Sequence, residues 1–273
     1  MRGRTFAWGE RTHLMAIVNV TPDSFSGDGC TDVARAVERA VAQWEAGADI
    51  LDIGGESTRP GHEPIDEATE RDRVLPVIAG VRARLPDAVI SIDTYKPAVA
   101  RAAHDAGADI INSIWGAPDA LIEVAVDCEM PLAAMHNQQG AHYAGDVVEA
   151  VVAFLRDCAR RAHGAGVPGE AIMLDPGIGF GKTAEHNVAL LRNLERIGEL
   201  GYATLLGASR KSTIGKLTGR DPHERIYGTA ATTALGIAYG ADVVRVHDVA
   251  QQRDVISVSD AIVRDWRPAG WTG

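Results

Sequence analysis

Eight short apolar runs recur along this chain of 273 residues, at intervals that leave room for a helix between them. Each run is rich in Val, Ile or Leu and nearly continuous, which is typical of parallel strands covered on both faces. The runs cover residues 14–20, 49–55, 88–93, 109–114, 131–136, 171–177, 203–209 and 242–248. Strands of this kind need helices packed over them, so this pattern constrains the fold more than any other feature.

Helical patterns fill the intervals between the runs. The clearest of them cover residues 32–47, 68–85, 96–107 and 146–166, and glycines mark helix ends at Gly47, Gly107, Gly166 and Gly240. An alternation repeated about eight times predicts an α/β fold: a single (β/α)8 TIM barrel with its active site at the C-terminal ends of the strands. An open, doubly wound sheet is the alternative.

The same alternation predicts one domain over residues 1–273, with its core at about 12–266. Residues 201–225 are more than one strand–helix unit needs, so we expect extra structure in the loop after the seventh strand. The segments EAGADILDIGG, DAGADIINSI and AYGADVVRVHD each contain a helix end, a Gly and a strand, and they resemble quasi-repeats of one half-unit.

Composition excludes several classes of function. The net charge of −10, from 27 basic and 37 acidic residues, argues against broad binding of nucleic acid or an anionic membrane. The three cysteines have no CxxC spacing, so neither a disulfide framework nor a structural zinc site is expected. Residues 1–13 lack the apolar core of a signal peptide, and no run approaches the roughly 20 apolar residues of a membrane helix. We expect a soluble, cytoplasmic protein.

Polar side chains stand at or just past the ends of the predicted strands. Any one of them has an ordinary reading as a loop cap, but together on one rim they predict a polar ligand, because buried polar groups need partners. They are Asn19, Asp52, Asp93, Asn112, His136, Asp175, Lys211, Arg245 and His247. Asp93 and Asp175 are expected across the barrel mouth from each other with Asn112 between them, which suits a flat heterocycle with several N–H donors.

Arg245 and His247 alternate along the last predicted strand and therefore face the same way. Together they make a plausible phosphate site. The alternative is that Arg245 pairs with a neighbouring acid, either Asp242 or Asp248.

Two other segments resemble anion sites. GASRKSTIG (207–215) places Lys211 at the start of a predicted helix, where backbone N–H groups favour anions. PGIGFGKT (176–183) looks like a P-loop, but Pro176 stands where that motif needs its first glycine, so we reject it.

Seven blocks of sequence carry a resemblance to a known family. They are NVTPDSFSGDG, DIGGESTRPG, SIDTYKPAVARAA, GADIIN, LDPGIGFGKT, GASRKS and VRVHDV, and they extend from about residue 14 to 250. In wording and order they resemble the dihydropteroate synthases, a family of pterin-binding TIM-barrel transferases. These condense 6-hydroxymethyl-7,8-dihydropterin pyrophosphate with p-aminobenzoate in folate biosynthesis, releasing pyrophosphate. The resemblance implies a Mg²⁺-assisted, SN1-like reaction.

The resemblance also implies roles for individual residues. Asp93, Asp175 and Lys211 are expected to be catalytic and, with Asn112, to form the pterin pocket. The pyrophosphate site is expected at Arg245, Val246 and His247, with Asn19 as the Mg²⁺ contact. The p-aminobenzoate site, where sulfonamides would compete, is expected at Thr58, Arg59, Pro60 and Ser212. The family further implies a homodimer whose partners are small-molecule substrates, not nucleic acid or membrane.

Some positions depart from the family pattern. Ser113 stands where an Asp is common, Asn137 follows His136 where Met is usual, and FSGDG replaces FSDGG. These departures leave two alternatives: a pterin-binding paralogue that is inactive or has altered specificity, and a methyltetrahydrofolate-dependent methyltransferase. The intact STRPG and RVH segments disfavour the methyltransferase.

Overall fold

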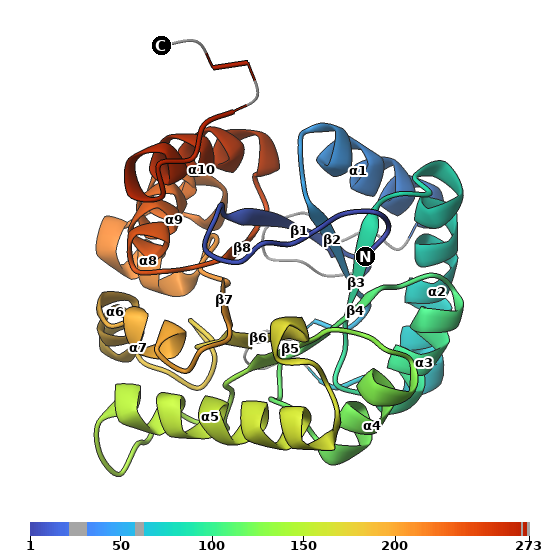
Figure 1. Ribbon diagram of the computed structural model, residues 1–273, viewed down its shortest axis with the longest axis horizontal. Coiled ribbons are helices and arrows are strands. Elements are labelled where there is room, and N and C mark those ends of the chain that lie inside the picture. The colour runs from blue at the N-terminus through green and yellow to red at the C-terminus, as the bar shows by residue number, and fades with distance from the viewer. Residues whose placement is uncertain (22–31, 58–62, 269, 272–273) are drawn as a thin grey trace.

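Eight parallel strands pair in chain order and close into a barrel in the computed structural model (Figure 1). The structure describes residues 1–21, 32–57, 63–268 and 270–271. The strands are β1 (His13–Asn19), β2 (Ile50–Gly54), β3 (Val89–Asp93), β4 (Ile110–Ser113), β5 (Leu132–Met135), β6 (Ile172–Asp175), β7 (Ala203–Leu206) and β8 (Val243–Val246). Each lies within a predicted run or one residue beyond it. The predicted (β/α)8 barrel is therefore confirmed, and the open sheet is wrong because β8 pairs with β1.

Helices surround the barrel and follow the strands in alternation (Figure 1). They are α1 (Val33–Glu45), α2 (Glu67–Arg84), α3 (Pro97–Asp105), α4 (Asp119–Asp127), α5 (Val147–Ala165), α6 (Ala184–Arg192), α7 (Glu195–Gly198), α8 (Ser212–Thr218), α9 (Ile226–Ala238) and α10 (Val249–Val263), with short 3-10 turns η1 (Gly169–Ala171) and η2 (Pro222–Glu224). Helix α8 and turn η2 are the extra structure predicted after the seventh strand. Gly166 caps α5 in the left-handed region at a φ of 116°, which explains that helix-stop signal.

The apolar side chains of the strands form two clusters, because successive side chains point alternately into the barrel and out toward the helices. On β4, for example, Ile110 belongs to the cluster inside the barrel, whereas Ile111 belongs to the larger one between strands and helices. The inner cluster consists of Met15, Ile50, Val89, Ile110, Ala133, Met173, Ala203, Leu205 and Val243. These residues lie toward the N-terminal half of the strands, so the polar strand ends occupy the opposite half of the barrel interior.

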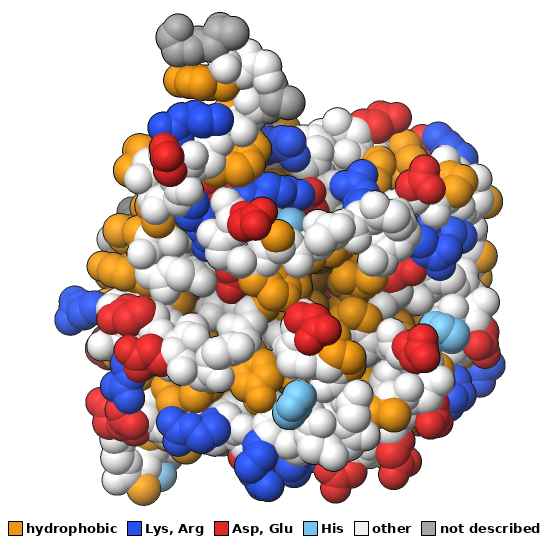
Figure 2. All heavy atoms as spheres, viewed as in Figure 1, with side chains coloured by type: hydrophobic (Ala, Val, Ile, Leu, Met, Phe, Trp, Pro, Cys, Tyr) orange, Lys and Arg blue, Asp and Glu red, His pale blue; other side chains and the backbone are white. Residues whose placement is uncertain are grey.

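The N-terminal segment closes the apolar end of the barrel. Phe6 and Trp8 pack against the inner cluster, and their rings lie 4.7 and 5.4 Å from the ring of His13 between centroids. In Figure 1 this segment crosses the near side of the barrel, and Figure 2 shows acidic and basic side chains interspersed over the same face. No helix in the described part of the chain is long and apolar enough to span a bilayer.

The three quasi-repeats share one structural device. In each, the Asp that precedes the strand accepts a hydrogen bond from a backbone N–H of the strand before it. The bonds join Asp49 Oδ2 to Leu14 N (3.0 Å), Asp109 Oδ2 to Ile90 N (2.9 Å) and Asp242 Oδ2 to Thr204 N (2.9 Å). These carboxylates therefore tie neighbouring strands together at the end opposite the predicted site, where they contribute to stability.

Candidate active site

Polar side chains from β1, β3 and β4 share one row at the C-terminal end of the barrel. Asn19 pairs in register with Gly54, Gly54 with Asp93, and Asp93 with Asn112. Because register partners face the same way, the three side chains point to the barrel interior together. Gly54 has no side chain and leaves a gap in the row. A Cβ at this position would lie 3.3 Å from the Asp93 Cβ and would crowd that side chain.

Arg245 joins this row from β8 through two ion pairs. Its Nε lies 2.6 Å from Asp52 Oδ2, and its Nη2 lies 2.7 Å from Asp93 Oδ2. The same Asp52 oxygen accepts a hydrogen bond of 3.0 Å from Asn112 Nδ2. Asp52 is 0% exposed, so this carboxylate is a fully enclosed anchor for both Arg245 and Asn112.

The pairing of Arg245 with a neighbouring acid of its own segment is wrong. Asp248 pairs instead with Arg210, whose Nε lies 3.0 Å from Asp248 Oδ2. Asp242 accepts from the backbone of Thr204 and lies at the other end of β8. Arg245 thus faces the barrel interior, as predicted for a side chain in the site.

Asp175 ends β6, with β4 and β5 separating that strand from the β3 of Asp93. Its Oδ1 accepts a hydrogen bond of 2.7 Å from the backbone N–H of Gly177. A Cβ at Gly207 would lie 3.4 Å from Asp175 Oδ2, so the absence of a side chain there keeps the approach to that oxygen open. The two carboxylates therefore stand on opposite sides of the barrel mouth, as the sequence predicts.

Burial shapes the electrostatics of the two carboxylates. It raises the pKa of Asp93 to about 7 and that of Asp175 to about 6, against the opposing effect of the cations Arg245 and Lys211. One oxygen of Asp93, Oδ1, is buried without a hydrogen-bond partner among the described residues. Carboxylates held in this way favour a ligand that brings N–H donors to them.

Lys211 approaches the same mouth from the loop after β7. It is the N-cap residue of α8, and its Nζ lies 3.9 Å from the centroid of the Phe180 ring, a cation–π contact. Phe180 belongs to the loop between β6 and α6, so this contact joins two loops over the barrel end.

The predicted pyrophosphate residues on β8 lie in different surroundings. His247 directly follows the strand, and its Nδ1 lies 3.0 Å from Ser209 Oγ, which also accepts the His247 backbone N–H at 3.2 Å. Val246 is buried in the outer cluster between strands and helices, so a substrate contact at this position would involve its backbone.

Of the four residues predicted to bind p-aminobenzoate, the structure describes only Ser212. Ser212 is exposed and begins α8 next to Lys211. Thr58, Arg59 and Pro60 lie outside the described residues.

Two residues received no individual role from the sequence patterns. Asp52 was predicted only as one of the polar strand ends, and the closed barrel brings it to Arg245. Lys182 lies in the segment rejected as a P-loop, and it donates to His136 Nδ1 at 2.9 Å and to the Phe180 carbonyl at 2.9 Å. Lys182 is identified by its position between two loops, and no sequence motif points to it.

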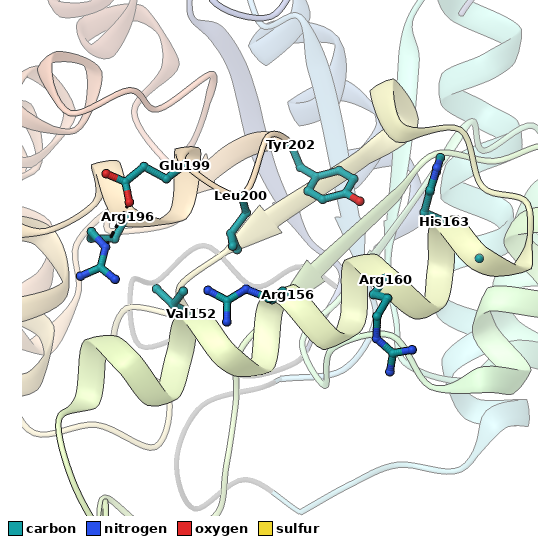
Figure 3. A pocket seen from close by; sticks show the side chains of 9 residues that line it. Val152, Arg156, Arg160, His163, Arg196, Glu199, Leu200 and Tyr202 are labelled. Carbon is teal, nitrogen blue, oxygen red and sulfur yellow. Dashed lines mark hydrogen bonds and ion pairs between the residues drawn. The ribbon is translucent and has the colours of Figure 1, made fainter.

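A groove of about 670 Å³ on the outer surface, between α5 and α7, is a weaker candidate (Figure 3). Two of its arginines already have carboxylate partners: Arg160 pairs with Asp157 at 2.6 Å, and Arg196 with Glu199 at 3.1 Å. The groove therefore lacks the enclosed carboxylates that distinguish the strand ends.

The geometry is that of a (β/α)8 barrel whose polar side chains gather at the C-terminal ends of its strands, where enzymes of this fold have their active sites. The model of the pterin binding enzyme family matches residues 15–247. The chain is 47% identical over 265 residues to the dihydropteroate synthase of Clostridium beijerinckii, covering 96% of this chain and 98% of the relative.

The chain is also similar to solved structures of dihydropteroate synthases. A dihydropteroate synthase of Clostridium difficile, in the presence of pteroic acid, is 44% identical with a TM-score of 0.90, covering 95% of this chain and 100% of that one. A dihydropteroate synthase of Xanthomonas albilineans with 4-aminobenzoic acid is 41% identical with a TM-score of 0.87, covering 93% and 94%. The chain therefore belongs to the pterin binding enzymes, and within them to the dihydropteroate synthase family.

Proposed function

We propose that this chain condenses 6-hydroxymethyl-7,8-dihydropterin pyrophosphate with p-aminobenzoate, giving 7,8-dihydropteroate and pyrophosphate. The observation that carries the proposal is the pair of enclosed carboxylates, Asp93 and Asp175, at the ends of β3 and β6, with Asn112 on β4 between those strands. A pterin ring offers several N–H donors in one plane, and Asp93 Oδ1 is a buried acceptor without a partner among the described residues.

The chemistry requires the pterin C–O bond to break while positive charge develops on the pterin. Asp93 and Asp175 would stabilise that charge, because fixed carboxylates in a water-poor pocket interact strongly with a nearby cation. Lys211 would bind the carbonyl side of the ring. Arg245 and His247 would hold the leaving pyrophosphate; two Arg245 nitrogens bond Asp52 and Asp93, and Nη1 has no hydrogen bond to a described residue. The arylamine needs positioning more than activation.

Mg²⁺ would bind at Asn19 together with the substrate. Mg²⁺ prefers oxygen ligands and is commonly held by few protein groups plus phosphates and waters. The described residues contain no group of three or more His, Cys, Asp or Glu that could hold a metal ion, whereas the half-buried residue Asn19, on the row of Asp93, could offer one amide oxygen. When bound, Mg²⁺ would stabilise charge on the leaving pyrophosphate. The donor set thus fits a metal that enters with the pyrophosphate.

The direct test incubates the purified chain with both substrates and Mg²⁺ and quantifies dihydropteroate and pyrophosphate. We expect equal amounts of the two products. We also expect chelation of Mg²⁺ to abolish the reaction. A chain that forms no dihydropteroate at saturating substrate contradicts the proposal. Binding of pteroic acid without turnover would identify the inactive paralogue instead.

The position of Ser113 disfavours that paralogue. Ser113 follows Asn112 on β4, so its side chain faces away from the barrel interior toward the surrounding helices. It is completely buried there, and its hydroxyl has no described partner. The departure from the family pattern therefore lies behind the pocket, where it leaves the Asp93 and Asn112 side chains in place.

We also propose that the chain forms a homodimer through α9 and α10, which pack side by side. Four large apolar side chains on these helices are more than half exposed: Tyr227, Leu235, Val258 and Ile262. Such a face is typical of an interface. Light scattering should give twice the chain mass for the wild type and the single mass for Ile262→Glu, while Val126→Glu on α4 stays dimeric. A monomeric wild type would contradict this.

A cytoplasmic location is part of the same proposal. Cys128 and Cys158 are free thiols, as expected in a reducing compartment.

A further inference from the structure

Lys182 is a partly buried amine with no carboxylate partner among the described residues. Its Nζ donates to His136 Nδ1 at 2.9 Å, to the Phe180 carbonyl at 2.9 Å and to the His136 carbonyl at 3.3 Å. No described carboxylate lies within ion-pair distance of it, whereas the buried Lys96 pairs with two, Glu56 and Glu70. A charge held without a counter-ion is costly, so the position invites a functional explanation.

The three acceptors of Lys182 belong to two different loops. His136 follows β5, and Phe180 lies between β6 and α6. The backbones approach so closely that a Cβ at Gly177 would lie 1.9 Å from the His136 carbonyl oxygen, and one at Gly181 would lie 2.4 Å from that of Gln138. Lys182 therefore fastens the loop after β6 onto the loop after β5.

Phe180 connects this fastening to the pocket. The ring of Phe180 lies under the Lys211 ammonium at 3.9 Å, and a Cβ at Gly179 would lie 3.0 Å from Lys211 Cδ. The loop that Lys182 holds thus forms the surface against which Lys211 rests. Any shift of that loop moves the Lys211 side chain relative to Asp175, at the start of the same loop.

We propose that Lys182 is a positioning residue of the pterin site. It fixes the loop that carries Phe180, and Lys211 rests on the Phe180 ring. The inference builds on the proposed function. Lys182 also favours the ionised carboxylate of Asp175, whose charged neighbours are Lys211, Arg245 and Lys182. The groups that face Lys182 itself are Asp175, Lys211 and His136.

The test compares Lys182→Met, which removes the donors and the charge, with Lys182→Arg, which keeps a cation. Lys216→Met, at an exposed lysine of α8, is the matched control. For Lys182→Met we expect the KM for the pterin substrate to rise about 10-fold, with the KM for p-aminobenzoate within about twofold of wild type. The acid limb of kcat/KM should move to higher pH, because Asp175 loses a neighbouring cation. Lys182→Arg should restore that limb.

Thermal unfolding of each variant separates positioning from simple loss of structure. The inference is overturned if activity falls only in proportion to the folded fraction, or if both KM values rise together and the acid limb does not move. A wild type that binds pteroic acid without turnover contradicts the proposed function alone, because the pH dependence of pteroic acid binding still tests Lys182. A wild type that neither binds nor turns over contradicts both.

Discussion

The Arg245 guanidinium lies against the fully buried carboxylate of Asp52, with Nε 2.6 Å from Oδ2. Asp52 is too enclosed to meet a substrate, yet it holds Arg245 from below while Asp93 holds it from the rim. The two carboxylates raise the pKa of Arg245 despite its burial, so the guanidinium stays charged. Under the proposed function, a cation anchored in this way would bind the leaving pyrophosphate without first rearranging.

Replacing Asp52 with Asn should loosen Arg245 and lower kcat/KM by about 10²-fold, because small misplacements of a binding group are costly. Burial is the main cause of the raised pKa of Asp93, and the charge of Asp52 adds to it. The acid limb of the pH–activity profile should therefore move to lower pH. Asp265→Asn, at an exposed carboxylate paired with Arg267, should change neither quantity. An unaltered profile for Asp52→Asn would contradict the assignment.

Replacing Asp175 with Asn should stabilise the fold and abolish most activity. Burial raises the pKa of Asp175 from 3.8 to about 6, so the ionised group destabilises the folded state by about 3 kcal/mol at pH 8. The stability that its protonation contributes is present below pH 3.8 and is lost as the pH rises through about 6.

Urea unfolding should show the Asp175→Asn variant about 3 kcal/mol more stable than wild type at pH 8, with the gap closing toward pH 4. We expect kcat to fall by about 10²–10³-fold. A variant less stable than wild type at pH 8 would show that the carboxylate is compensated in the free protein.

Replacing Gly177 with Ala tests the close approach of the loops after β5 and β6. Gly140 provides the control, because its φ of 72° matches the 70° of Gly177 but its Cβ position is open. We expect Gly140→Ala to cost about 1–2 kcal/mol of unfolding free energy from backbone strain alone. Gly177→Ala must also move the His136 carbonyl, so its cost should be clearly larger. Equal losses in urea unfolding would refute the clash.

Replacing Asp109 with Ala tests the strand ties at the end of the barrel opposite the site. Asp109 accepts from the Ile90 backbone N–H at 2.9 Å and from Arg82 Nη2 at 2.7 Å. The Ile90 N–H would lose this acceptor, while Arg82 Nη2 keeps its bond of 2.7 Å to the Gly107 carbonyl. We expect a loss of about 1–3 kcal/mol in unfolding free energy, with kcat unchanged in the folded enzyme. Asp105→Ala, at a side chain that is 77% exposed, should have little effect. A kcat that falls with stability would argue against separate roles for the two ends.

The eight apolar runs were sufficient to predict the strands, the barrel and the ends at which Asn19, Asp93 and Asp175 stand. These predictions rest on local patterns: which residues are apolar, how often they recur and where a run stops. The period-two alternation of β8 also predicts that Val246 points out of the barrel, because Arg245, the preceding residue on the strand, points inward.

Which polar groups pair was decided by tertiary structure alone. Asp52 and Arg245 are 193 positions apart in the chain and meet because β8 closes onto β1 beside β2. Lys182 fastens two loops only because β5 and β6 are neighbours in register. Hydrogen bonds and ion pairs act over a few ångströms, whereas the sequence patterns carry information about neighbours along the chain. The ends of the strands could therefore be read from the sequence, but their partners depended on the closed barrel.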